Sequence, residues 1–122
     1  MNSILWILSI VLAATYAATG ATKVVARRER LLAIPGMGWV EEAPPSRVRL
    51  IGLVEIAGAV GVVVPWATGM LPLLTPLAAW GLAAVQVGAI WTHLSRREPD
   101  HLWLNVLLFV VAVAVAVGRS IA

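Results

Sequence analysis

The chain has 122 residues, of which 61% are hydrophobic and 12% are charged, and its mean hydropathy is +0.92. Soluble domains are about half apolar and a quarter charged, so this composition indicates a membrane protein with a single domain, residues 1–122. The absence of cysteine excludes disulfides, thiolate metal sites and iron–sulfur clusters within the chain. The net charge of +3 comes with no aromatic-basic motif, which argues against nucleic-acid binding.

Residues 4–22 form the first apolar segment long enough to cross a bilayer, and the segment ends at Lys23. Tyr16 and Thr19 precede Lys23 by seven and four residues, which places all three on one helix face. Small residues after the apolar core resemble a signal-peptide cleavage site. No basic stretch comes before the core, however, so we expect the segment to be retained as a membrane span.

The connection after the first segment is long and basic. Its sequence RRERLLAIPGMGW, residues 27–39, predicts a short amphipathic piece along the membrane interface, broken by proline and glycine and anchored by Trp39. Glu41, Glu42 and two prolines then predict a polar turn into the second segment. Both a solvated loop and a lid over a site remain open for this connection.

The second apolar segment covers residues 48–64, is expected to stop at Pro65 and contains Glu55. This carboxylate lies roughly 10 Å beyond Val48 at the helical rise per residue. Such a depth is costly for a charge, so the side chain is expected to face the protein interior and to have a partner. Lys23 and Arg49 are the candidate cations, and the pair can be a structural ion pair or part of a site.

The third and fourth segments, residues 73–93 and 102–117, complete an all-α integral membrane protein with a four-transmembrane-helix bundle. The fourth is β-branched, but a span in lipid must satisfy its own backbone hydrogen bonds, which favours a helix. Antiparallel neighbours would gather the intramembrane polar residues in one half of the bundle. We therefore predict a polar pocket there, with no metal site, lined by Tyr16, Lys23, Arg49, Glu55, Gln86, His93 and Asn105.

The other half of the predicted bundle contains no comparable polar cluster. Small residues on the second and third segments permit close helix packing, and they favour a homo-oligomer or a larger membrane complex. These residues are Gly58, Gly61, Ala84 and Gly88. Tryptophans near the segment ends are typical of an aromatic belt at the bilayer interface. They are Trp6, Trp66, Trp80, Trp91 and Trp103.

Basic residues are distributed unevenly over the connections. Eight lysines and arginines lie in the first and third connections, against Arg119 alone on the opposite side. The positive-inside rule therefore predicts that these two connections face the cytoplasm and that both termini lie outside it.

With these features together, the chain resembles the DoxX-like family of small four-helix bacterial inner-membrane proteins. The resemblance rests on ATGATKVV with Lys23, GMGWVEEAPP, RLIGLVEIAGAVGVVVP with Glu55, and AIWTHL with His93. It implies a link to redox or quinone metabolism, with a quinone as the candidate ligand and no intrinsic cofactor. Thiosulfate–quinone oxidoreduction and thiol redox chemistry do not carry over, because the chain has no cysteine and no soluble partner domain.

Three function classes remain. A binding or accessory membrane subunit is favoured, with a catalytic oxidoreductase subunit as an alternative. The other alternative is a small multidrug-type, proton-coupled transporter, which also has four helices and one membrane carboxylate. Those transporters carry the acid on the first helix, and their dual-topology members need balanced charges, whereas this chain has neither feature.

Overall fold

The structure is a computed structural model that describes residues 2–121, apart from the side chain of His101. Four helices are long and apolar enough to cross a membrane: α1 (Asn2–Val25), α3 (Pro45–Thr68), α4 (Leu74–Ser95) and α5 (Leu102–Ile121). Residues 2–121 contain no strand. The predicted all-α, four-helix membrane bundle is confirmed, and the chain is a multi-pass membrane protein.

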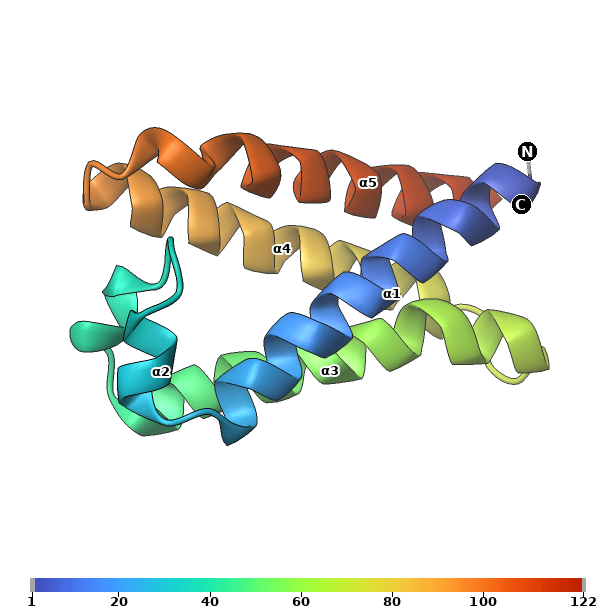
Figure 1. Ribbon diagram of the computed structural model, residues 1–122. Coiled ribbons are helices and arrows are strands. Elements are labelled where there is room, and N and C mark those ends of the chain that lie inside the picture. Colours follow the sequence, from blue (N-terminus) through green and yellow to red (C-terminus); the bar gives the residue numbers. More distant parts are fainter. Residues whose placement is uncertain (1, 122) are drawn as a thin grey trace.

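The four long helices form a ring in which each packs against two others. Helix α1 contacts α3 and α5, and α4 contacts the same two helices from the other side (Figure 1). Both chain ends lie at one end of the bundle, which we call the terminal end. The connections α1–α3 and α4–α5 lie at the opposite end, which we call the loop end.

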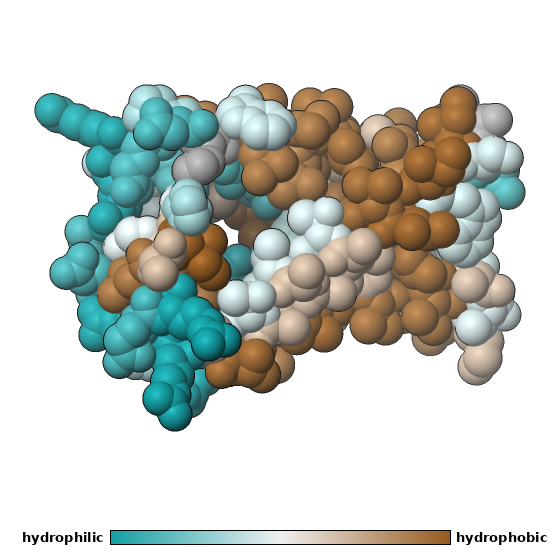
Figure 2. Space-filling model, in the orientation of Figure 1, coloured by the Kyte–Doolittle hydropathy of each residue, from teal (hydrophilic) through white to brown (hydrophobic). Residues whose placement is uncertain are grey.

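The interior of the bundle is rich in alanine, and many of its large apolar side chains lie on the outside. Its interior contains the alanines 59, 79, 83, 112 and 116, whereas leucines, isoleucines and valines are exposed on all four long helices. Figure 2 shows the resulting hydrophobic band, with hydrophilic residues gathered at the loop end. Small interior residues let helix backbones approach closely, and lipid takes the place of water around the outer side chains.

The closest approach of α1 and α3 is made by two glycines. A Cβ atom added to Gly20 would lie 2.7 Å from the carbonyl oxygen of Gly52, and one added to Gly52 would lie 2.7 Å from the carbonyl oxygen of Gly20. Any larger residue at either position would therefore push the two helices apart. Lys23 and Glu55 each follow one of these glycines by three residues, so the crossing also brings their side chains together.

The expectation that Pro65 stops the second helix is wrong, because α3 continues to Thr68. Proline has no N–H to donate to the carbonyl of Gly61, four residues earlier. The hydroxyl of Thr75 on α4 donates to that carbonyl instead, at 3.0 Å. A neighbouring helix thus satisfies the freed backbone group, which is the condition for proline inside a membrane helix.

The other helix ends also differ from the prediction. Helix α3 begins at Pro45 rather than Val48, since proline is well placed in the first helical turn. Helix α5 runs past Val117 to Ile121 and so contains Arg119, which the sequence had placed outside the span. The α4–α5 connection contains a short 3-10 helix, η2 (Pro99–His101).

The long α1–α3 connection folds into α2 (Arg28–Leu32) and a 3-10 helix, η1 (Gly38–Glu41). Two of its apolar side chains, Leu31 and Val40, form a small buried cluster with Val48 of α3, whereas Leu32 and Ile34 are exposed. The guanidinium of Arg28 donates to the carbonyl of Glu41 at 2.6 Å, which joins the two short helices. We call α2 and η1 together the loop lobe.

Two of the four small residues expected at an oligomer contact are used inside the chain instead. A Cβ on Gly58 would meet the side chain of Leu82, and one on Gly61 would meet Ala78, both on α4. Gly88 has open space around it, and Ala84 is exposed. Association with a second copy or a larger partner stays a prediction, and it now rests on the α4 pair alone.

Candidate functional site

The centre of the candidate site is an ion pair between α1 and α3. The Lys23 ammonium contacts both carboxylate oxygens of Glu55, with Oε2 at 3.0 Å. The hydroxyl of Thr19 donates to the same Oε2 at 3.2 Å. Glu55 is 2% exposed, whereas the Lys23 side chain is 13% exposed. The pair therefore has one deeply buried partner and one that reaches toward the loop end.

A second polar chain joins three helices near this pair. The Gln86 amide on α4 donates to the hydroxyl of Tyr16 on α1, and the Asn105 amide on α5 donates to Gln86 Oε1 at 2.9 Å. The Tyr16 hydroxyl also donates to the backbone carbonyl of Leu82, at 3.4 Å. Tyr16 and Gln86 are buried. One face of α1, which carries Tyr16 and Lys23, thus connects to all three other spanning helices.

The ion pair leaves hydrogen-bonding capacity unused. An ammonium group has three donors, and Glu55 takes two of those of Lys23. The third donor has no hydrogen-bond partner in the described part of the chain. Because this donor lies in a low-dielectric bundle, a hydrogen bond to it would be stronger than the same bond in water.

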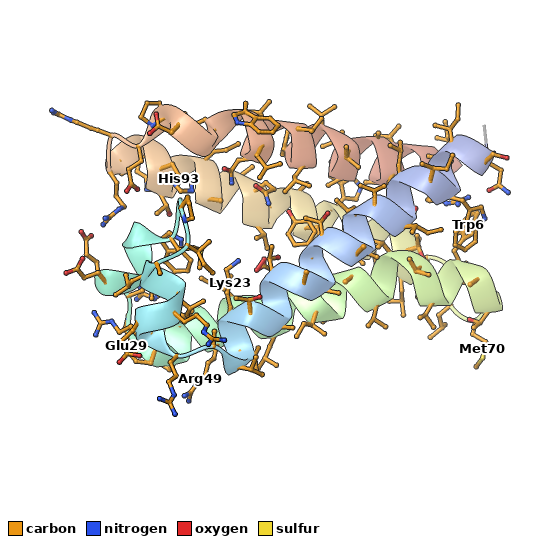
Figure 3. The ribbon with its side chains drawn as sticks, in the orientation of Figure 1. Trp6, Lys23, Glu29, Arg49, Met70 and His93 are labelled. Carbon is orange, nitrogen blue, oxygen red and sulfur yellow. The ribbon has the colours of Figure 1, made fainter. Side chains whose placement is uncertain are left out.

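A hollow of about 290 Å³ lies at the loop end, between the end of α1, the loop lobe and the start of α3. Lys23 lines it, and Figure 3 shows that side chain pointing into the space beside the loop lobe. Apolar Leu31, Val40 and Val48 form part of the wall. Arg49 also lines the hollow but is exposed and forms no ion pair with Glu55. The structure thus selects Lys23 over Arg49 as the partner of Glu55.

His93 lies apart from the ion pair. It is buried at the end of α4, and its Nδ1 has no hydrogen-bond partner in the described part of the chain, with Glu98 Oε1 at 3.6 Å. Like Glu55 and Gln86, it is not among the residues that line the hollow. Glu55, Gln86 and His93 thus lie outside this hollow, and a cavity shared by the three stays a prediction.

Near His93, Arg96 links the α1–α3 connection to the α4–α5 connection. It forms ion pairs with Glu42 of the α1–α3 connection and, at 2.9 Å, with Glu98 of its own connection. The hydrogen bonds that Arg96 donates to Glu42 and, to a smaller extent, to Glu98 raise the pKa of its guanidinium above the ordinary value. This contact holds the loop lobe against the end of α4, and it was not anticipated from the sequence because its members are 54 residues apart.

A family model, described as the DoxX-like family, matches residues 7–115 of the chain. The chain belongs to the DoxX-like family. The match begins within α1 and ends within α5, and it includes every residue of the polar contacts above. No curated protein and no solved structure matches the chain.

Two features of this DoxX-like protein were missed at the sequence level. The first is the helix crossing at Gly20 and Gly52. The sequence indicates it only weakly, in that each glycine precedes a charged intramembrane residue by three positions. The second feature is at the terminal end, which the sequence had described as apolar. Arg119 is buried there beside Trp6 and Trp66, so these two tryptophans do more than anchor helix ends. The remaining belt tryptophans, Trp80, Trp91 and Trp103, are exposed.

Proposed function

We propose that this protein is a binding or accessory membrane subunit that holds a small ligand at the Lys23–Glu55 pair. The observation that carries the proposal is a buried ion pair on spanning helices, whose Lys23 is also among the residues that line a hollow. Burying two charges costs more than packing two apolar side chains of similar size. A structural role alone gives little reason to keep such a pair, whereas a ligand that needs a charged donor does.

The chemistry of the hollow supports a ligand with a carbonyl head and an apolar body. The unused donor of Lys23 suits a carbonyl oxygen, and Leu31, Val40 and Val48 suit an apolar ring or chain. A quinone has both parts. The link of the DoxX-like resemblance to redox or quinone metabolism supports the same class of ligand, and we propose a quinone as the molecule bound.

The experiment compares co-purified small molecules in wild type and Glu55→Gln, both extracted in mild detergent and examined by mass spectrometry. We expect wild type to retain a quinone and Glu55→Gln to fold but lose about tenfold or more of it, since the carboxylate that holds the Lys23 ammonium in position is lost. Glu41→Gln is the matched control, because Glu41 is an exposed carboxylate at the loop end.

The double variant Lys23→Met with Glu55→Met separates a site from a structural ion pair. If the pair only stabilises the fold, this variant is stable and keeps the ligand. Retention of the quinone by a stable double variant would therefore contradict the proposal.

Proton-coupled drug transport receives less support from the geometry. Such a transporter needs a carboxylate that exchanges a proton for a cationic substrate. In this protein, Glu55 already forms an ion pair with Lys23 and accepts a hydrogen bond from Thr19. Uptake of protons coupled to export of a cationic dye from proteoliposomes would favour transport over binding.

We further propose that the loop end faces the cytoplasm of a bacterial cell, with both termini outside. All eight lysines and arginines other than Arg119 belong to the loop end, which the positive-inside rule places in the cytoplasm. The chain has no cysteine, so single cysteines report location cleanly. In intact spheroplasts, an impermeant maleimide should label Met70→Cys and leave Arg30→Cys unlabelled; the reverse pattern would invert the orientation.

A further inference from the structure

At the terminal end, Arg119 in the last turn of α5 is buried, with 3% of its surface exposed. Its guanidinium carbon lies 4.4 Å from the ring centroid of Trp66 on α3 and 5.3 Å from that of Trp6 on α1. Its Nη1 donates to Asn2 Oδ1 at 2.7 Å. Three helices therefore build a polar site around one cation, at the end of the molecule where Figure 3 labels Trp6.

One edge of this guanidinium has no partner. Nε and Nη2 of Arg119 are buried and find no hydrogen-bond acceptor in the described part of the chain. These two nitrogens carry parallel N–H groups that match the two oxygens of a phosphate or carboxylate. Because Asn2 contacts the other nitrogen, the two-pronged edge is held in place and left unused.

Within residues 2–121, no acidic side chain pairs with Arg119. The segments that meet at the terminal end, residues 2–10, 60–75 and 113–121, contain no aspartate or glutamate. Contacts with two aromatic rings compensate a guanidinium only in part. A buried cation near hydrocarbon without an anionic partner is strongly unfavourable, so an anion from outside the chain would relieve a real cost.

We propose that Arg119 binds the phosphate group of a membrane phospholipid, between Trp6 and Trp66. The site lies at the ends of spanning helices, where headgroups are found and where tryptophan side chains are favoured. The unpartnered edge is covered, so the phosphate enters when the first turn of α1 or the last turn of α5 opens. Helix ends open at low cost, which makes this entry feasible. The site is independent of the Lys23–Glu55 pair, which lies toward the other end.

The experiment measures the unfolding temperature of protein purified in a maltoside detergent with no phosphate. Three probes are added separately: phosphatidylglycerol, diacylglycerol with the same acyl chains, and inorganic phosphate. At about a hundred times its dissociation constant, phosphatidylglycerol should raise the midpoint by roughly 5 °C or more in wild type. A rise with inorganic phosphate as well would show that a free oxyanion suffices, and a rise with the lipid alone would assign the site to a headgroup.

Variants identify the residue responsible. Arg119→Gln should abolish the lipid-induced rise, and Arg119→Lys, which keeps the charge but not the two-pronged edge, should retain a smaller rise. Arg47→Gln is the matched control, because Arg47 is exposed near the loop end, and it should respond as wild type does. Lipid phosphorus retained after purification should fall by about one per chain in Arg119→Gln, which is a second readout on the same site.

Two results would overturn the proposal. The first is an equal rise with diacylglycerol, because the acyl chains and not the phosphate would then be recognised. The second is an equal lipid response in wild type and Arg119→Gln, because the guanidinium would then have no part in binding.

Discussion

The two ends of this small bundle each bury a cation, and they treat it differently. Lys23, toward the loop end, meets a carboxylate of the chain itself, because two glycines bring α1 and α3 into close contact beside it. Arg119, at the terminal end, meets two aromatic rings and one amide oxygen, and it forms no ion pair within residues 2–121. A buried charge can thus be compensated from within the protein or left for a partner outside it.

The comparison makes a clear prediction about unpaired charges. Replacing Lys23 with Met leaves Glu55 buried without its cation, which should lower the free energy of unfolding by about 3–5 kcal/mol. The measurement is a denaturation titration in mixed detergent micelles. Arg27→Met, at an exposed position, is the matched control and should change stability by about 0.5 kcal/mol or less.

Adding Glu55→Met to Lys23→Met should recover most of the lost stability, because the double variant buries no charge. A double variant as unstable as the single one would show that the cost comes from lost packing. Lys23 and Glu55 would then contribute to stability through side-chain packing, as their apolar neighbours do, and not through their charges.

A second prediction tests whether the glycine crossing positions the pair. Gly20→Ala places a Cβ against the carbonyl oxygen of Gly52, which cannot move freely, and should cost about 1–3 kcal/mol as overpacking does. The control is Gly88→Ala, where no atom lies within 4 Å of the new Cβ and stability should hold or rise slightly. If Gly20→Ala and Gly88→Ala changed stability equally, the close helix crossing would no longer explain how the ion pair is positioned.

A third prediction concerns the polar contact between α3 and α4. Thr75→Val removes the hydroxyl that satisfies the carbonyl of Gly61, at an expected cost of about 0.5–2 kcal/mol in the free energy of unfolding. In a Pro65→Ala background the backbone N–H can satisfy that carbonyl, so Thr75→Val should cost less there. A double-mutant cycle measures the difference, and full additivity would contradict this assignment.

The smallest effect is expected at the terminal end, in contrast to Lys23→Met. Without phospholipid, Arg119→Met removes an unpaired charge along with aromatic contacts that compensate it only in part, so the free energy of unfolding should stay unchanged or rise by about 1 kcal/mol. The same denaturation titration in phosphate-free detergent measures this value. A loss as large as that for Lys23→Met would show that Arg119 is fully compensated within the chain, and the two ends would then be alike.

The loop-end contacts were partly predictable because they follow from depth and spacing along single helices. Glu55 lies too deep in an apolar segment to stand alone, and Lys23 closes the preceding span at a similar depth. Gln86 and Asn105 lie at comparable depth on the antiparallel helices that follow. The fold class followed from composition and segment length, since a chain in lipid has few ways to satisfy its backbone.

Other features needed the assembled bundle. The sequence predicts a helix end at Val117, which places Arg119 just outside the span. In the structure α5 continues to Ile121, and Arg119 is buried within it. The backbone carbonyl that Pro65 leaves free is satisfied by Thr75 from another helix. His93 shares the expected depth, yet it lies beside Glu98 and away from the hollow, because depth does not fix the direction of a side chain.

The sequence by itself determined that this protein crosses the membrane four times as helices, and that Glu55 requires a partner. Both follow from the cost of exposing a backbone group or a charge to hydrocarbon, which local sequence already reveals. Only the tertiary structure decided that Lys23 and not Arg49 is that partner, and that Arg119 is enclosed by Trp6 and Trp66. Those choices depend on how helices distant in the chain cross, and two glycines that let backbones touch set one of the crossings.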